Sequence, residues 1–294
     1  MTRILASPVS APDRGGLTVP VEKFDSADEL FFSADPGALR YEVRLDERGT
    51  LDALMVNKGS RALVVVFHGA MVKGHHHLPR FEWLRTLDEQ TKYSCLFLSD
   101  PTLTLDPELL LSWYLGWEEL DLSPVLSEVV LKAAQAAGAE RIILTGSSGG
   151  AFAALQVGSL LPGSLAIAFN SQTAISKYHW DAQASFLHRI MPDLYPKKRS
   201  RRSRWAKVLG ERASVIQRYA APRQNYALVV QNVRDEHHYE HHYLPFAAAV
   251  QDGPNAERIV FEEYSAGPFH EPPGRERFVR TIRRGIRMLD EWAT

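Results

Sequence analysis

The stretch Arg141-Ile-Ile-Leu-Thr-Gly-Ser-Ser-Gly-Gly-Ala-Phe-Ala-Ala-Leu155 combines two elements and the turn that joins them. A short β-branched run that ends at Leu144 predicts a buried strand, and the Ala-rich segment that begins at Ala151 predicts a helix. Between them, Gly146-Ser-Ser-Gly-Gly150 has the form G-x-S-x-G. Glycines two residues on either side of Ser148 let strand and helix pass closely while the serine takes a strained backbone conformation. We therefore expect the Ser148 hydroxyl to project beyond the end of the strand.

This turn has other interpretations that the sequence can test. A glycine-rich turn between strand and helix can be purely structural, or it can hold a phosphate. Neither a Lys-Ser nor a Lys-Thr pair follows the glycines, and no G-x-G-x-x-G is present, so the two common nucleotide-binding loops are excluded. Ser147 is a second candidate nucleophile, but its neighbours two positions away are Thr145 and Gly149. We interpret Ser148 as the nucleophile.

Strand-like and helical patterns alternate through the rest of the chain. Apolar runs typical of strands cover residues 39–45, 51–56, 63–67, 93–98, 141–144, 165–169, 226–230 and 258–261. Apolar residues at helical spacing mark residues 124–137 and about 275–292. This alternation predicts an α/β fold with a mostly parallel central β-sheet flanked by helices on both faces.

Composition narrows the class of protein. The 294 residues are 45% hydrophobic and 23% charged, with a formal net charge of −1, so no global charge points to a nucleic-acid partner. The single cysteine, Cys95, lies in an apolar run and predicts a buried thiol. We find neither a secretory signal nor an apolar run long enough for a transmembrane segment, which predicts a cytoplasmic location. The oligomeric state is left open.

The chain resembles the α/β-hydrolase superfamily over about residues 41–294. Four features carry the resemblance, namely Phe67-His-Gly-Ala70, the segment from Gly146 to Gly150, Asp235 and His270. A serine nucleophile needs a base and a carboxylate that orients the base. The superfamily order of serine, acid and histidine implies that Asp235 and His270, each placed after a late predicted strand, complete a catalytic triad with Ser148.

Each of these two residues also has an ordinary structural interpretation. Asp235 precedes a helical pattern and could be a helix N-cap, a frequent use of aspartate. His270 could be a surface-loop histidine bonded to backbone. Asp181, which follows the preceding predicted strand, is the alternative acid.

The resemblance also implies an oxyanion hole made of two backbone N–H groups. One comes from Gly149, and the other from the loop after Phe67, where we favour Ala70 over Met71. His68, Gly69 and His75 are expected to lie beside the substrate. The three-glycine loop of many lipases is absent, so the subfamily is not identified.

Residues 1–20 are rich in Pro, Ser, Ala and Gly and predict a flexible N-terminal arm before a single domain at 21–294. The resemblance suggests that residues 174–222 form a helical cap over the active site. Within them, the basic run 197–207 is either a solvated helix start or a dock for an anionic substrate. The apolar stretch 109–117 could be core, pocket wall or interface.

Four histidines cluster between His237 and His242. On a helix, two pairs of them would share faces at a spacing that can bind a metal. However, no H-E-x-x-H motif and no third ligand are evident, so we expect a helix near the rim of the active site and no metal.

Together these patterns predict a carboxylic-ester hydrolase that works through an acyl-enzyme on Ser148 and needs no cofactor. The expected substrate is a small-molecule or glycan-linked acyl ester, with an anionic ester as one form. A serine nucleophile argues against relatives that attack with a carboxylate, such as dehalogenases. An acyltransferase with the same triad, a thioesterase, a peptidase and a non-catalytic binding protein of the same fold remain alternatives.

Overall fold

A nine-stranded sheet forms the centre of the protein in the computed structural model, which describes residues 19–198 and 204–292. The strand order is β1-β2-β3-β5-β4-β8-β9-β10-β11. The strands are β1 (Val21–Phe24), β2 (Gly37–Arg44), β3 (Thr50–Asn57), β4 (Ala62–Phe67), β5 (Ser94–Leu98), β8 (Arg141–Ser147), β9 (Leu165–Phe169), β10 (Tyr226–Asn232) and β11 (Ile259–Tyr264). A separate two-stranded sheet pairs β6 (Gly116–Trp117) with β7 (Leu120–Asp121).

Most neighbouring strands are parallel. From β5 through β4, β8, β9 and β10 to β11 every pairing is parallel, whereas β3 pairs antiparallel with both β2 and β5. The prediction of a mostly parallel sheet is confirmed. Three strands, β1, β6 and β7, were not predicted. Of these, β1 pairs parallel with β2 and lies directly after the predicted N-terminal arm, of which only residues 19 and 20 are described.

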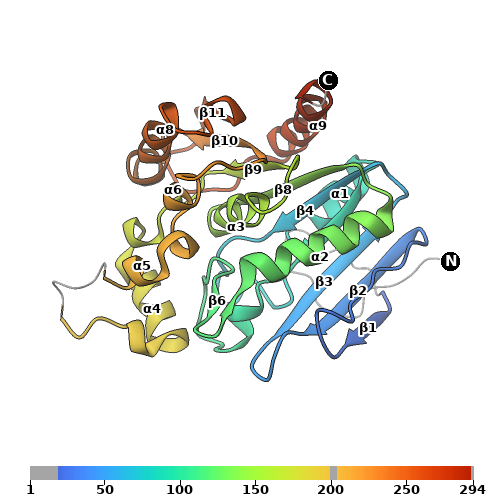
Figure 1. Cartoon of the computed structure of the whole chain (residues 1–294), viewed down its shortest axis with the longest axis horizontal. Coiled ribbons are helices and arrows are strands. Elements are labelled where there is room, and N and C mark those ends of the chain that lie inside the picture. The colour runs from blue at the N-terminus through green and yellow to red at the C-terminus, as the bar shows by residue number, and fades with distance from the viewer. Residues whose placement is uncertain (1–18, 199–203, 293–294) are drawn as a thin grey trace.

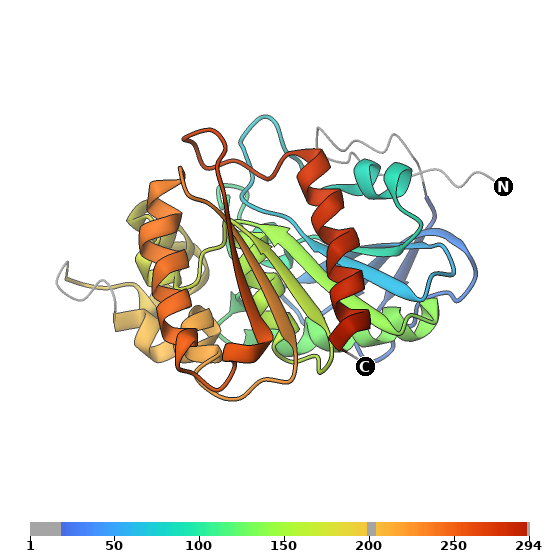
Figure 2. The ribbon, with the colours of Figure 1, turned by 90° about the horizontal axis from the view of Figure 1, so that it is seen from above.

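Helices cover both faces of the sheet (Figures 1 and 2). On one face lie α1 (Leu84–Gln90) and α9 (Arg275–Trp292), which contact each other, and on the other lie α2 (Leu122–Ala137) and α3 (Gly149–Gly158). In α2 the apolar stripe predicted from helical spacing is buried against the sheet, and Asp121 caps the first turn by accepting from Ser123 N–H. Gly138, at φ 63°, ends α2 in the left-handed conformation that glycine adopts without strain.

Short helices fill the long connection between β9 and β10. They are η2 (Ile175–Lys177), α4 (Trp180–Ile190), η3 (Pro192–Leu194), α5 (Arg204–Leu209), η5 (Gly210–Ala213) and α6 (Val215–Arg218). They pack on the stretch 109–117: Trp113 meets Phe186 of α4 edge to face at 6.0 Å, and Trp205 of α5 belongs to the same buried cluster. The stretch 109–117 is therefore mostly core, with Leu110 its exposed member.

After β10 the chain forms α7 (Glu236–His238), a π-helical turn η6 (Tyr239–Tyr243) and α8 (Leu244–Gln251). The remaining short helices are η1 (Pro101–Thr104) and η7 (Ala256–Arg258). Within residues 19–198 and 204–292, no helix is both long enough and apolar enough to cross a bilayer. The carboxyl ends of β4, β8, β10 and β11 all lie along one edge of the sheet, because these strands are parallel.

Candidate active site

Ser148 lies at the turn from β8 to α3 in a strained backbone conformation. Its φ of 58° and ψ of −121° fall outside the regions that a non-glycine residue readily adopts. A hydrogen bond of 3.0 Å from Ser148 N–H to Phe169 C=O holds the turn against the end of β9. The residue is 8% exposed, so its hydroxyl is close to the surface without lying open to solvent.

The two flanking glycines are required by close backbone approaches. A Cβ atom at Gly146 would lie 2.5 Å from the carbonyl carbon of Gly150, and one at Gly150 would lie 2.3 Å from the carbonyl oxygen of Phe67. Neither contact is possible for a real side chain, so positions 146 and 150 are restricted to glycine. Ser147, the second candidate, is the last residue of β8 and has ordinary strand geometry.

Asp235 follows β10 and is 4% exposed. Its Oδ2 atom lies 2.6 Å from Nδ1 of His270, and its Oδ1 atom lies 3.0 Å from Nδ1 of His238. Asp235 is indeed the N-cap residue of α7, but its side chain makes no capping bond and is engaged by the two histidines instead. Burial acts to raise the pKa of Asp235, but the hydrogen bonds from both imidazoles outweigh it and hold the pKa well below its ordinary value.

The two imidazoles on this carboxylate stack on each other. The ring centroids of His238 and His270 are 3.8 Å apart, and the ring planes differ by 6°. His238 is buried at 1% exposure, whereas 31% of the His270 side chain is exposed on the loop after β11. Sequence reasoning placed the His237–His242 segment near the rim and did not assign His238 to the site. The only sequence signal was the spacing of three residues after Asp235.

The hydroxyl of Ser148 is bonded by an unexpected partner. Nε2 of Gln172, on the loop after β9, donates to Ser148 Oγ at 2.9 Å and lies 2.7 Å from Nε2 of His238. Among the hydrogen bonds of the described residues, none joins Ser148 to His270. Asp235 and His270 are thus brought together, while the nucleophile is connected to them through Gln172 and His238.

The N–H groups of Ala70 and Gly149, expected to form the oxyanion hole, are free within the described ranges of the chain, whereas that of the alternative, Met71, is not. Met71 N–H donates to Leu110 C=O at 2.7 Å, so it is already used. Neither Ala70 N–H nor Gly149 N–H donates to any acceptor in the described part of the chain. A free N–H at the start of α3 also carries the positive end of the helix dipole. Of the three expected donors, Ala70 and Gly149 are therefore the two whose N–H groups are not already used by a described acceptor.

A buried ion pair fixes the loop that carries Ala70. Arg80 and Glu82 are joined at 2.9 Å, with side chains only 6% and 9% exposed. Arg80 also donates to Ala70 C=O at 2.7 Å, and Glu82 accepts from Gly69 N–H at 2.9 Å. Because backbone groups on both sides of the Ala70 amide are held, that amide has a fixed direction.

His68 also braces this loop. Its Nδ1 contacts Gly69 C=O at 2.7 Å, its Nε2 accepts from Asp100 N–H at 3.0 Å, and the residue is 2% exposed. Burial lowers the pKa of His68 to about 3, so the ring is neutral with its proton on Nδ1. His75, by contrast, is exposed, and its backbone N–H bonds Val72 C=O. The expected contacts of His68, Gly69 and His75 with a substrate remain predictions.

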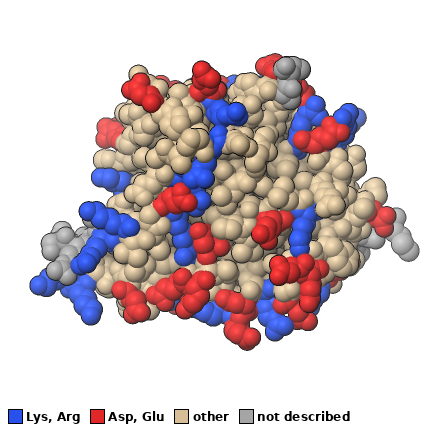
Figure 3. Space-filling model, in the orientation of Figure 1, with Lys and Arg blue, Asp and Glu red and all other residues tan. Residues whose placement is uncertain are grey.

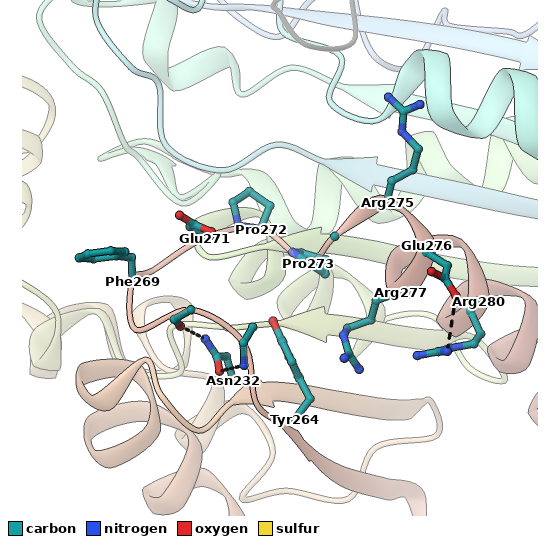
Figure 4. A pocket seen from close by; sticks show the side chains of 13 residues that line it. Asn232, Tyr264, Phe269, Glu271, Pro272, Pro273, Arg275, Glu276, Arg277 and Arg280 are labelled. Carbon is teal, nitrogen blue, oxygen red and sulfur yellow. Dashed lines mark hydrogen bonds and ion pairs between the residues drawn. The ribbon is translucent and has the colours of Figure 1, made fainter.

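A cavity of about 530 Å³ opens beside the His270 loop, between β11 and the start of α9 (Figure 4). Phe269 and Glu271, the neighbours of His270, help to line it, but Ser148 does not. Arg277 lies over the Tyr264 ring there, at 4.1 Å from the ring centroid. This cavity therefore adjoins the loop without containing the nucleophile.

Asp235, His238 and His270 offer ligand atoms within 4.8 Å of one another, a set with metal-like composition. A histidine binds a metal along a lone pair in the plane of its ring. The two stacked rings occupy nearly parallel planes and direct Nδ1 to different carboxylate oxygens, so one ion cannot lie in both planes. The arrangement fits two hydrogen bonds, one from each imidazole to the Asp235 carboxylate, better than a metal ion bound by all three side chains.

Two further predictions concern the connection between β9 and β10. Asp181, the alternative acid, is exposed in the first turn of α4, and no histidine within the described ranges bonds to it. Part of the basic run, residues 199–203, lies outside the described residues; Lys197, Lys198, Arg204 and Lys207 are exposed. Lys and Arg side chains gather at this edge of the molecule (Figure 3).

Comparisons with known proteins found structural but not sequence relatives. No protein-family model matches the chain, and no curated protein matches it. A solved structure of the capsule O-acetyltransferase of Neisseria meningitidis serogroup A has a TM-score of 0.56 at 15% identity, covering 82% of this chain and 94% of that one. Carboxyl esterase 2 of the mycorrhizal fungus Tuber melanosporum has a TM-score of 0.52 at 12% identity, with 92% and 91% covered. At such identities the likeness concerns the fold alone.

Proposed function

We propose that this chain, which has the α/β-hydrolase fold, is a serine hydrolase that cleaves a carboxylic ester through an acyl-enzyme on Ser148. The observation that carries the proposal is the strained Ser148 backbone at the end of β8, beside the free amides of Ala70 and Gly149. A structural turn gains nothing from such a conformation, whereas a nucleophile held at a sheet edge requires it. The 2.6 Å contact between Asp235 and His270 supports Asp235 as the acid and His270 as the base.

In the first half of the proposed reaction, Nε2 of His270 takes the Ser148 hydroxyl proton as Oγ attacks the ester carbonyl carbon. The carbonyl oxygen becomes an oxyanion that accepts from Gly149 N–H and Ala70 N–H. The imidazolium of His270 is stabilised by the Asp235 carboxylate and then gives its proton to the leaving alcohol oxygen. The carbon–oxygen bond to the alcohol breaks, and the acyl group stays on Ser148.

In the second half, His270 takes a proton from water, whose oxygen attacks the acyl carbon. The same two amides stabilise the second oxyanion. The bond to Ser148 Oγ breaks as His270 returns the proton to Oγ, and the carboxylic acid leaves. This chemistry uses only side chains and backbone of the chain and requires no cofactor.

The proposal is tested by hydrolysis of short p-nitrophenyl esters. Ser148→Ala is expected to lower kcat for ester hydrolysis by a factor on the order of 10³ or more, because the acyl-enzyme cannot form. Ser147→Ala is the matched control, since it removes a hydroxyl one residue away from the same turn and should retain activity. Equal loss in both variants, with both proteins folded, would contradict the assignment of the nucleophile.

The second candidate function is acyl transfer to an alcohol other than water. The likeness to an O-acetyltransferase, of which one solved structure contains CoA, favours it. In this case the incoming alcohol loses its proton to His270 in the second half of the reaction, and an ester is the product. Product analysis with an activated ester and rising concentrations of added alcohols separates the two candidates: a constant acid yield supports the hydrolase, and conversion to new esters supports the transferase.

The exposed cations Lys197, Lys198, Arg204 and Lys207 support an anionic substrate as a further part of the proposal. Attraction between exposed charges is screened by salt, with a Debye length of about 10 Å at 0.1 M. Catalytic efficiency toward an anionic ester is therefore expected to fall steeply as salt rises. A response as flat as that of a neutral ester would contradict this part.

A further inference from the structure

Gln172 and His238 form a buried connection between the nucleophile and the acid. Gln172 is fully buried and His238 is 1% exposed, although both are polar. The Gln172 amide nitrogen is 2.9 Å from Ser148 Oγ and 2.7 Å from His238 Nε2. His238 Nδ1 is in turn 3.0 Å from Asp235 Oδ1. One line of contacts thus runs from Ser148 through two buried side chains to the carboxylate.

The chemistry of the groups gives the hydrogen bonds their direction. An amide NH₂ group has two hydrogens and no free acceptor, so Gln172 donates one hydrogen to Ser148 Oγ and the other to His238 Nε2. His238 then accepts at Nε2, is neutral, and donates from Nδ1 to Asp235. In the reverse amide orientation, Gln172 Oε1 would face His238 Nε2, so Nε2 would carry the hydrogen and Nδ1 would be an acceptor. The ionised Asp235 carboxylate has no hydrogen to donate to Nδ1.

We propose that Gln172 and His238 are positioning residues that orient the Ser148 hydroxyl and the Asp235 carboxylate for His270. The inference rests on the proposed function. Gln172 donates to one lone pair of Ser148 Oγ, so the hydroxyl hydrogen must point away from Gln172 and can be given to His270. His238 occupies Asp235 Oδ1, which leaves Oδ2 for His270.

His238 also provides a platform for the base. His270 lies on an exposed loop, and its ring stacks flat on His238 with centroids 3.8 Å apart. The buried ring is itself surrounded by His237, His242 and Tyr178, whose ring centroids lie between 5.4 and 5.7 Å away. Burial lowers the pKa of His238 to about 4, so at neutral pH it does not repel a protonated His270.

Two substitutions at His238 separate its contacts. In His238→Asn, the amide nitrogen takes the place of Nδ1, so the bond to Asp235 is kept while the contact with Gln172 is lost. In His238→Gln, the amide group takes the place of Nε2, so the contact with Gln172 is kept while the bond to Asp235 is lost. At Gln172, the isosteric change Gln172→Glu removes both donated hydrogens. Gln156→Glu is the matched buried control, since it makes the same change at a buried glutamine that bonds Glu211 C=O, Arg212 C=O and Arg218 outside the site.

The experiment measures kcat, KM and the rate of fluorophosphonate labelling for all variants, with urea unfolding as the check on folding. We expect Gln172→Glu and both His238 variants to lower kcat by roughly 10- to 100-fold with KM nearly unchanged, because they misdirect reacting groups without contacting the ester. His238→Gln should slow labelling more than His238→Asn does, because only His238→Gln loses the bond to Asp235 Oδ1 that leaves Oδ2 for His270. The Gln156→Glu control should change none of these values.

The outcomes distinguish this inference from the proposed function. If the native protein is labelled on Ser148 and the folded Gln172 and His238 variants react at its rate, the positioning role is overturned while the hydrolase proposal stands. If the native protein is not labelled on Ser148, the proposed function fails and the positioning role fails with it. Slow labelling of the variants with a normal KM supports both.

Discussion

Three fully or nearly buried histidines make the fold sensitive to mild acid. His68, His238 and His242 are 2%, 1% and 0% exposed, and burial lowers their pKa values from 6.5 to about 3, 4 and 2. The folded state therefore keeps them neutral while the unfolded chain takes up protons near pH 6.5. Stability depends on the difference in bound protons, so it is lost as pH falls through 6.5 and continues to fall toward the pKa values of the folded state.

The size of the effect follows from these values. At pH 5.5 an unfolded histidine of pKa 6.5 gains about 1.4 kcal/mol by protonation that its folded counterpart does not gain. For three histidines the free energy of unfolding should be roughly 4 kcal/mol lower at pH 5.5 than at pH 7.5, a large share of the 5–15 kcal/mol typical of a domain. The lowered pKa of Asp235 does not contribute here, because its stabilising effect is lost only below its ordinary pKa of 3.8.

Urea unfolding at pH 7.5, 6.5 and 5.5 measures this difference. His242→Asn removes one of the three groups and should reduce the difference between pH 7.5 and 5.5 by about 1.4 kcal/mol. His241→Asn, on the exposed side of the same π-helical turn, is the control and should leave the difference unchanged. An unfolding free energy that is constant from pH 7.5 to 5.5 would refute the reasoning, as would equal effects of the two substitutions.

Three further predictions concern the turn at Ser148, the loop that carries Ala70, and Asp235. Gly150→Ala should lower the free energy of unfolding by about 3 kcal/mol, because its Cβ would lie 2.3 Å from a backbone oxygen, whereas Gly267→Ala meets no atom within 4 Å and should be nearly neutral in the same urea titration. Arg80→Met leaves the buried Glu82 carboxylate without its cation and should lower the free energy of unfolding by about 3 kcal/mol or more, against less than about 1 kcal/mol for the exposed Arg85→Met; similar values would argue against a structural role of the Arg80–Glu82 ion pair. Asp235→Asn should lower kcat for p-nitrophenyl esters by roughly 10³- to 10⁴-fold with the protein still folded, and retained activity would remove this residue from the triad.

Much of the fold was predictable because the determining patterns are local. Every predicted strand is present within a few residues of its expected bounds, and the helix expected at about 275–292 is α9. The signal in these segments is a run of apolar residues long enough to specify burial on one or both faces. The strand β1 has only four residues, none of them fully buried, so its pattern was too short to predict.

Candidate site residues could be predicted only where a motif or chain order marks a residue. Ser148 lies in a motif, and Asp235 and His270 follow strands in the superfamily order. Gln172 and His238 have no such mark, because their contacts exist only once β9 and β10 pair in parallel and bring the loops after them together. The π-helical turn after α7 was likewise hidden, since His237 and His241 are spaced as for an ordinary helix.

The measurement that tests the central claim most directly is labelling with a fluorophosphonate probe, followed by peptide mass mapping of the adduct. Native protein and Ser148→Ala are compared at equal concentration, with urea unfolding to show that both are folded. The proposed function predicts one adduct, on Ser148, in the native protein and none in the variant. A folded native protein that gives no adduct, or an adduct that persists in Ser148→Ala, would contradict it.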